Sequence, residues 1–489
     1  MKATKLMIIG AAALMATASY ADNPKREFRG AWMHTIFQGQ YKDQSTEQNK
    51  AYLKKELDSL KAAGVNAVLF QVRPQADALY PSSLEPWSRF LTNDGNAPEP
   101  FWDPLEFMVE ECHKRGLELH AWLNPYRVTS NTKQVLPKGH IYHKHPERFI
   151  KYDGKLYFDP GMPENREFIG TVVDDIVARY DIDGIHFDDY FYPYPVAGKE
   201  FGDDASYKKY GNGMKLDDWR RKNVDLLIED LHKRIHAAKP WVRFGVSPFG
   251  IHRNKSTDPN GSETSGLQNY DALFADVLLW EKEGWIDYLI PQLYWELEHK
   301  AASYLVLVDW WNKHAGDNCH LYIGQDVSKA MTKTDLAPST EKTQLRHKVE
   351  LARAGKNIKG NCWWPGYAVT KNVGGAADSL KTYFQSTMAL VPSYANIKSD
   401  GPQPVKEVNV KDGVISWKGS NSGNKTEDAV KYVVYRFSGL DNIDMNNAGA
   451  ILDVTPSTNF KTNGSGVYVI TALDRVNNES EGSSAIIIE

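Results

Sequence analysis

Two carboxylates stand where the sequence predicts the ends of buried strands. Asp188 follows the apolar residues of the segment DGIHFDDY, and Glu296 lies in the segment LIPQLYWELE. Successive strand residues point to opposite faces, so both carboxylates are expected on the face opposite the apolar side chains of their segments. Cleavage of a glycosidic bond needs such a pair: one carboxylic acid protonates the leaving oxygen, and one carboxylate attacks the anomeric carbon or activates water.

The neighbours of the two carboxylates suggest different roles for them. Asp188 suits the nucleophile or the stabilising charge, because Arg73 or Arg127 could hold it ionised. Glu296 lies among aromatic residues, and an apolar wall raises the pKa of a carboxyl group, which suits the general acid. Each carboxylate could instead belong to a structural ion pair. The carboxylates that compete with Glu296 for the second role are Asp189 and Glu298.

Further polar and aromatic residues stand at the expected ends of other strands and could bind a sugar. Hydroxyl and acetamido groups need hydrogen-bonding partners, and flat aromatic faces suit sugar rings. A single histidine at such a place is often structural, so the joint placement of the set is what favours a binding cleft. The candidates are His34, Gln71, Arg73, His120, Asn124, Arg127, His186, Asp189, His252, Gln292, Tyr294, Trp295, Gln325, Asp326, Trp363 and Trp364.

A metal site is the alternative arrangement for some of these residues. His186, Asp188, Asp189 and His252 could surround a divalent ion. The chain has no HExxH pair, no GxGxxG or Walker loop and no GxSxG elbow. We therefore expect neither a metal ion nor a cofactor.

Alternating strand-like and helix-like segments are expected to position the candidates. Eight such units favour a closed (β/α)₈ barrel, an α/β fold, over residues 27–391. The connections from strand to helix are long, and in a barrel they crowd the face where active sites lie. The strands are expected at 29–34, 66–73, 117–123, 184–188, 242–247, 286–294, 320–325 and 360–364. The helices are expected at 46–63, 104–115, 163–180, 216–238, 270–283, 299–313, 341–354 and 375–390.

After residue 391 the alternation of strand-like and helix-like segments stops. Residues 392–404 are rich in Ser, Asn, Asp, Gly and Pro and are expected to be a linker. Short strand-like segments fill 405–489 and predict a small all-β sandwich that resembles a fibronectin type III domain, with Trp417 in its core and Tyr468 as a corner tyrosine. Such a module is expected to be a spacer that the chemistry does not need.

The start of the chain has the features of an export signal. Two lysines precede an apolar run over residues 6–18, and Ser19 with Ala21 supplies small side chains for cleavage. Residues 1–21 are therefore expected to be removed, and the mature protein is expected in the periplasm or at the cell surface. No later segment is apolar enough to cross a membrane.

The charge and the aromatic content of the chain indicate which classes of ligand it could bind. The formal net charge is −4, so the chain has no basic excess to hold phosphate backbones, and nucleic acid is not expected as a partner. Its 14 Trp and 25 Tyr residues suit an oligosaccharide or polysaccharide. The three cysteines lack metal-ligand spacing and are expected to be buried free thiols.

Several long motifs resemble a bacterial glycosyl-hydrolase-like family, formerly a domain of unknown function. They include EFRGAWM, VLFQVRPQADALYPSSLEPWS, GLELHAWLNPYR, DGIHFDDYFYPYP, FGVSPFGIHRN and LYIGQD, and the resemblance covers residues 27–383. It implies a barrel with Asp188 as a catalytic residue. It also implies an N-acetylated envelope glycan, similar to peptidoglycan strands, as the substrate.

Two alternatives stay open within this resemblance. If the sugar carries a 2-acetamido group, that group could itself attack, with Asp188 or Asp189 orienting it. The chain could also be a non-catalytic glycan-binding protein on the same scaffold.

Overall fold

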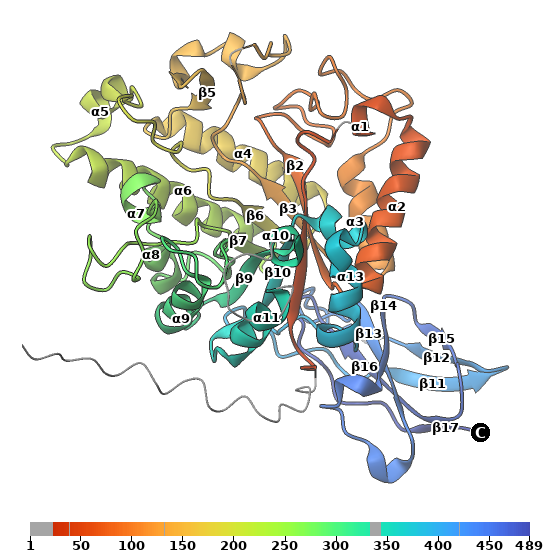
Figure 1. The fold of residues 1–489 in the computed structure, drawn as a ribbon. Helices are drawn as coiled ribbons and strands as arrows, with labels where there is room; N and C mark the ends of the chain where they lie inside the picture. Colours follow the sequence, from red (N-terminus) through yellow and green to blue (C-terminus); the bar gives the residue numbers. More distant parts are fainter. Residues whose placement is uncertain (1–22, 39, 132, 333–343, 420) are drawn as a thin grey trace, which may run out of the picture.

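Eight parallel strands close into a barrel, as the alternating pattern predicts (Figure 1). The computed structural model describes residues 23–38, 40–131, 133–332, 344–419 and 421–489. The expected signal peptide at 1–21 lies outside the described residues. The barrel strands are β1 (Phe28–Met33), β2 (Ala67–Arg73), β3 (Glu118–Leu123), β6 (Gly184–Phe187), β7 (Arg243–Val246), β8 (Tyr288–Leu289), β9 (His320–Asp326) and β10 (Ile358–Trp364).

Helices cover the outside of the barrel. Local signals set their starts: Ser45 and Gln48 form a capping box at α2, and Asp103 accepts hydrogen bonds from Leu105 N and Glu106 N at α3. The helices are α1 (Gln40–Asp43), α2 (Thr46–Ala62), α3 (Pro104–Lys114), α4 (Pro163–Arg179), α5 (Asp204–Tyr210), α6 (Leu216–Ala238), α7 (Asn269–Ala272), α8 (Val277–Lys282), α9 (Tyr304–His314), α10 (Val327–Thr332), α11 (Leu345–Ala354), α12 (Gly366–Thr370) and α13 (Ala376–Ser379). None of the helices in the described residues combines the length and apolar character needed to span a membrane.

Three expected elements are shorter than the pattern suggests. Strand β8 has two residues, because Pro291 lacks the N–H that a central strand must donate. The expected helix at 270–283 is divided into α7 and α8 where Phe274 adopts a positive φ of 54°. The expected helix at 375–390 is α13 followed by a π-helical turn at Leu380–Phe384.

The C-terminal segment forms an all-β domain of two antiparallel sheets. Trp417 is buried in it, and Tyr468 donates its hydroxyl to Gly464 O at 2.7 Å, as expected of a corner tyrosine. The strands are β11 (Lys406–Lys411), β12 (Val414–Lys418) and β15 (Asn459–Lys461) in one sheet, and β14 (Ile451–Thr455), β13 (Lys431–Phe437), β16 (Gly466–Leu473) and β17 (Ile486–Ile488) in the other.

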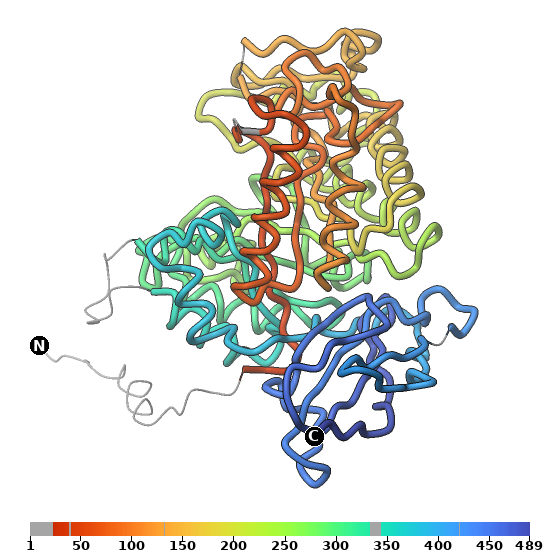
Figure 2. Tube along the Cα trace, turned by 90° about the vertical axis from the view of Figure 1, so that its right-hand side faces the viewer, coloured from red at the N-terminus to blue at the C-terminus, as the bar shows by residue number. Residues whose placement is uncertain are grey.

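This domain packs against the N-terminal ends of the barrel strands, on the side opposite the mouth (Figure 2). The expected linker is part of the contact. Tyr394 stacks on His320 with ring centroids 4.1 Å apart, and its hydroxyl lies 2.7 Å from that of Tyr322. Asn396 donates to Asp287 at 2.8 Å. Residues 392–404 therefore hold the two domains together.

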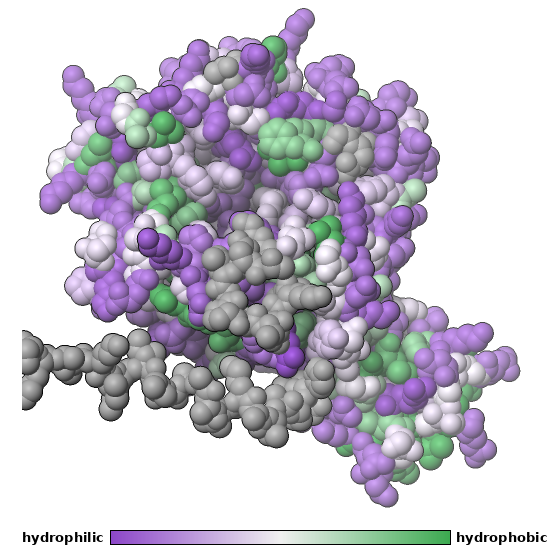
Figure 3. Space-filling view, in the orientation of Figure 1, coloured by the Kyte–Doolittle hydropathy of each residue, from purple (hydrophilic) through white to green (hydrophobic). Residues whose placement is uncertain are grey.

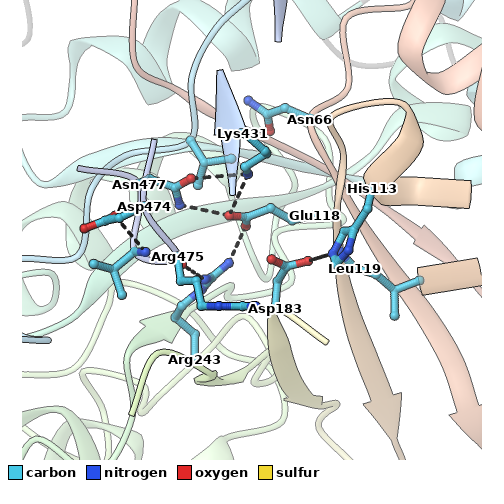
Figure 4. Close-up of polar contacts among 12 residues, drawn as sticks. Asn66, His113, Glu118, Leu119, Asp183, Arg243, Lys431, Asp474, Arg475 and Asn477 are labelled. Atoms are coloured by element: carbon cyan, nitrogen blue, oxygen red, sulfur yellow. Dashed lines mark hydrogen bonds and ion pairs between the residues drawn. The ribbon is translucent and has the colours of Figure 1, made fainter. Parts of the chain in front are cut away.

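A buried ionic cluster lies at the centre of this interface (Figure 4). Glu118, at the start of β3, forms an ion pair with Arg243 at 2.6 Å and lies 3.8 Å from Lys431. Asn477 of the C-terminal domain donates to the same carboxylate at 2.9 Å. Burial alone would raise the pKa of Glu118, but Arg243 and Lys431 outweigh it and hold that pKa well below its usual range.

If the C-terminal module were an independent spacer, a chain truncated near residue 393 would still fold. Such a truncation would remove Lys431 and Asn477 from a carboxylate that is 1% exposed. We expect Lys431→Met to lower the free energy of unfolding by about 1–3 kcal/mol, because Glu118 then loses one of its charge partners. Urea unfolding measures the change, and Lys461→Met, on the exposed surface of the same domain, is the control. Equal stability of the two variants would contradict the role given to Lys431.

Candidate active site

Asp188 lies at the mouth of the barrel, directly after β6. Its side chain is 3% exposed and accepts hydrogen bonds from three neighbours. Trp122 Nε1 donates at 3.0 Å, Asn124 Nδ2 lies 3.2 and 3.3 Å from the two oxygens, and the Tyr190 backbone N–H donates at 3.3 Å. The carboxyl group is therefore held in one orientation by two side chains of β3 and its following loop.

The pKa of Asp188 differs from that of the ionised nucleophile or stabilising charge that was expected. Burial and the negative charge of Asp189 raise the pKa of Asp188 to about 7, although Arg127 opposes the shift. Arg73 does not neutralise it, because its guanidinium forms a buried ion pair with Glu85 at 2.5 Å. This raised pKa does not fit the expectation that Arg73 or Arg127 holds Asp188 ionised. Its carboxyl group titrates near neutrality, which is the property of a proton donor and acceptor.

Asp189 is the second buried carboxylate of the mouth. The Tyr194 hydroxyl donates to one oxygen, and Gln292 Nε2 donates to the other at 3.0 Å. Gln292 also donates to the carbonyl of Ser247 at 2.9 Å, so it is anchored from β7. Burial raises the pKa of Asp189 as well. Both oxygens of Asp189 are thus engaged by the protein.

Aromatic rings surround these carboxylates. Trp364 is half-buried at the end of β10, and its ring centroid lies 6.2 Å from that of Trp122, 4.9 Å from that of His34 and 6.5 Å from that of Tyr294. The rings of Trp364 and Tyr294 are nearly parallel, at 12°. A partly exposed aromatic face next to Asp188 suits the stacking of a sugar ring.

Glu296 lies in the loop after β8, outside the strand that was expected to carry it. It is half-buried and close to Lys348, whose ammonium donates to Trp295 O at 2.6 Å. Burial lowers the pKa of Lys348 to about 8, and the charges of Asp326 and Glu296 oppose this shift. A cation therefore lies within electrostatic reach of Glu296. Trp295 turns toward Phe249, with ring centroids 5.3 Å apart.

A column of buried polar groups supports the mouth from inside the barrel. His120 Nε2 lies 3.2 Å from Glu118, and its Nδ1 lies 2.8 Å from the hydroxyl of Tyr288. The same hydroxyl lies 3.2 Å from His186 Nδ1. His186 Nε2 accepts from Trp32 at 3.1 Å and lies 3.0 Å from Ser247 Oγ. Both histidines are fully buried, so they position other groups and do not touch a ligand.

Three other residues that were expected to bind sugar, Gln71, Arg73 and His252, are buried and contact other protein groups. Gln71 accepts from the backbone N–H groups of Thr35 and Ile36 and so holds the loop after β1. His252 stacks on Trp310 in the loop after β7, and burial lowers its pKa to about 3. These side chains are buried, as is Arg73, whose charge is already paired.

Two of the expected sugar-binding residues, Gln325 and Trp363, face away from the barrel interior. Gln325 alternates with the inward Gly324 and Asp326 and donates to the hydroxyl of Tyr304 on α9 at 2.7 Å. Trp363 precedes the inward Trp364 and is 1% exposed beneath the helices. Their positions at strand ends were predicted correctly, but period two places them outside the barrel. Glu296 and Trp295 lie in the loop after β8, on the same face of the barrel, and Glu296 shares the cation Lys348 with Asp326. The other expected residues that gather at the mouth are His34, Asn124, Arg127, Asp188, Asp189, Gln292, Tyr294, Asp326 and Trp364.

Trp122 and Tyr194 contact the two aspartates directly, but neither was among the expected site residues. Trp122 could have been found, because it alternates with His120 and Asn124 and shares their face. Tyr194 lies in a loop, where no periodicity indicates a direction. Arg127, which was expected beside Asp188, stacks on Tyr190 with its guanidinium 4.5 Å from the ring centroid.

The structure offers no support for the alternative metal site. In the parts of the chain that the structure covers, no three His, Cys, Asp or Glu side chains are grouped to hold an ion. His186 uses both ring nitrogens inside the barrel, and His252 packs on Trp310. The three cysteines are buried and free, as expected.

The pKa of Asp188 can be tested through its neighbour. We expect Asp189→Asn to lower the pKa of Asp188 from about 7, because the substitution removes the adjacent negative charge. Carboxyl ¹³C NMR over a pH series measures the shift. Asp326→Asn removes another carboxylate of the mouth and is the control. An unchanged titration of Asp188 in Asp189→Asn protein would show that burial alone sets its pKa.

Comparisons with known proteins identify the family of the chain. The family model for glycosyl hydrolase-like 10 matches residues 27–339. The glycosyl hydrolase YngK of Bacillus subtilis (strain 168) is 40% identical over 478 residues, covering 94% of this chain and 92% of the relative. The glycosyl hydrolase DigH of Escherichia coli (strain K12) is 39% identical over 319 residues, covering 60% of this chain and 71% of the relative.

A solved structure shares the fold. The glycoside hydrolase domain of PgaB (BpsB) from Bordetella bronchiseptica superposes with a TM-score of 0.50 at 14% sequence identity, covering 73% of this chain and 99% of that domain. At this identity the likeness concerns the fold alone. The family model and the two sequence relatives carry the assignment: the chain belongs to the glycosyl hydrolase-like 10 family.

Proposed function

We propose that the chain hydrolyses glycosidic bonds in an N-acetylated glycan of the cell envelope. The observation that carries the proposal is Asp188, a buried carboxyl group with a pKa of about 7 at the mouth of a (β/α)₈ barrel. Aromatic rings for stacking lie beside it, and two sequence relatives are named glycosyl hydrolases. The N-acetylated substrate rests on the family resemblance.

Asp188 acts as the general acid in this mechanism. With a pKa of about 7, a large fraction of the group is protonated at neutral pH, and its proton passes to the leaving glycosidic oxygen as the bond to the anomeric carbon breaks. The resulting carboxylate is stabilised by the N–H groups of Trp122, Asn124 and Tyr190. It then takes a proton from the water that completes hydrolysis, which restores the acid.

Glu296 supplies the second carboxylate. The ammonium of Lys348 lies within electrostatic reach of this carboxylate, which could attack the anomeric carbon or activate water or a 2-acetamido group. Asp189 is less suited to attack, because Tyr194 and Gln292 occupy both of its oxygens. Its role is to keep the pKa of Asp188 high. The expected roles of acid and ionised partner are thus exchanged between Asp188 and Glu296.

Release of reducing ends from purified peptidoglycan strands without peptides tests the activity. We expect Asp188→Asn to lower kcat by about 10³-fold or more, and Glu296→Gln to lower it comparably, because each acts in the transition state. Glu298→Gln, two residues away and exposed, is the control and should stay near wild type. Near wild-type turnover of Asp188→Asn would remove that residue from the mechanism. Binding of strands without turnover by the wild type would instead favour a glycan-binding protein.

The proposal also places the mature protein outside the cytoplasm. It rests on the lysines, apolar run and small residues of positions 1–21. We expect N-terminal sequencing of the protein recovered from the periplasm or cell surface to begin near Asp22. A chain that starts at Met1 in the cytoplasm would contradict export.

A further inference from the structure

A groove of about 640 Å³ opens between the loops that follow β1, β2 and β3. Its apolar lining includes Phe37, Phe90, Leu136 and Pro137, and Phe37 is 70% exposed. On the upper part of the molecule, apolar patches lie among hydrophilic side chains (Figure 3). Exposed aromatic surface in a groove on the same face as the active site suits a ligand that extends beyond the mouth.

Arg89 is the unusual residue of this groove. Its Nε donates to Gln75 at 3.2 Å and its Nη2 donates to Ser130 at 3.1 Å, while the guanidinium stacks on Phe90 at 4.3 Å from the ring centroid. Both acceptors are neutral. Among the described residues, Arg89 forms no direct ion pair, and the buried carboxylate of Asp77 acts on it only through longer-range charge. A half-buried guanidinium that is fixed in place and makes no direct ion pair can still bind an anion at its open edge.

The charge around the groove is positive. Lys42 and Lys133 line it together with Arg89, and Asp94 is the acidic side chain among the lining residues. Lys42 has Asp43 at 3.5 Å, but that carboxylate is not part of the lining. Exposed lysines attract an anion at long range, and the fixed arginine then sets its position.

The groove adjoins the active site. Gln38 lines the groove, and its side-chain amide lies 2.5 Å from His34 Nε2. The ring of His34 lies 4.9 Å from that of Trp364, which in turn contacts Trp122 beside Asp188. A glycan chain bound at Trp364 can therefore continue past His34 into the groove.

We propose that this groove is a distal subsite of the glycan cleft, where Arg89 binds the carboxylate of an acidic sugar unit. The planar guanidinium matches a carboxylate in shape and charge, and the apolar face of the sugar ring packs on Phe37 and Phe90. The inference rests on the proposed function and names a feature of its substrate. The chain accordingly prefers glycans whose sugars carry carboxylates over neutral N-acetylated glycans.

The experiment compares two ligands that differ in charge alone. Peptide-free glycan strands with free carboxylates are compared with the same strands after amidation of these carboxylates. Equilibrium binding is measured with Asp188→Asn protein, which prevents consumption of the ligand, before and after a second substitution, Arg89→Gln. The glutamine can still hydrogen-bond but has lost the positive charge. Lys144→Gln, exposed on a neighbouring loop outside the groove lining, is the control.

We expect Arg89→Gln to raise the Kd for the acidic strands about tenfold, as for loss of one charge-assisted contact, and to leave the Kd for amidated strands unchanged. Lys144→Gln should alter neither value. Thermal unfolding checks that the variant is folded; if Arg89→Gln is not, Lys133→Gln serves in its place, with an expected increase of about threefold.

Equal affinity of the acidic and amidated strands, or an equal effect of Arg89→Gln on both, would overturn the subsite. A failure of the proposed function looks different. In that case the wild type releases no reducing ends from either strand, whereas the charge-dependent difference in Kd persists.

Discussion

The ion pair between Glu118 and Arg243 is the contact on which the interior of the barrel depends. A buried carboxylate accepts hydrogen bonds only, so His120 presents Nε2–H to Glu118, and in the neutral imidazole its Nδ1 is then an acceptor. The Tyr288 hydroxyl then donates to His120, and its oxygen accepts from His186 Nδ1–H. This assignment leaves His186 Nε2 free to accept from Trp32 and Ser247. One charge at the base thus fixes the hydrogen-bond direction through the barrel.

Such a column is stable only if every member is satisfied, because an unpaired polar group in a barrel core is costly. The column ends below the mouth at Ser247, whose carbonyl anchors Gln292 and through it Asp189. Asp189 in turn contributes to the raised pKa of Asp188. The raised pKa of Asp188 therefore depends on a geometry to which groups deep inside the barrel contribute.

The C-terminal domain belongs to this arrangement. Lys431 and Asn477 complete the surroundings of Glu118, and Arg243 also donates to the carbonyl of Arg475 at 2.8 Å. Two domains that share one buried ionic cluster are expected to lose stability together, since opening the interface would expose unpaired charges. This differs from the independent spacer that the polar composition of residues 392–404 suggested. Composition reports that a segment lacks apolar residues, but not what it packs against.

The amino-acid sequence by itself determined the parts of the protein that follow from local periodicity. The alternation of strand and helix predicted the barrel, and period two placed Asp188 at its mouth, because both signals extend over a few neighbouring residues. Tertiary structure alone decided the rest. Arg73 pairs with Glu85 instead of Asp188, and Gln325 turns outward to the hydroxyl of Tyr304 on α9. The pKa of Asp188 and the ion pairs of Glu118 depend on groups that are distant in the chain, and only folding brings these groups close enough for their charges to interact.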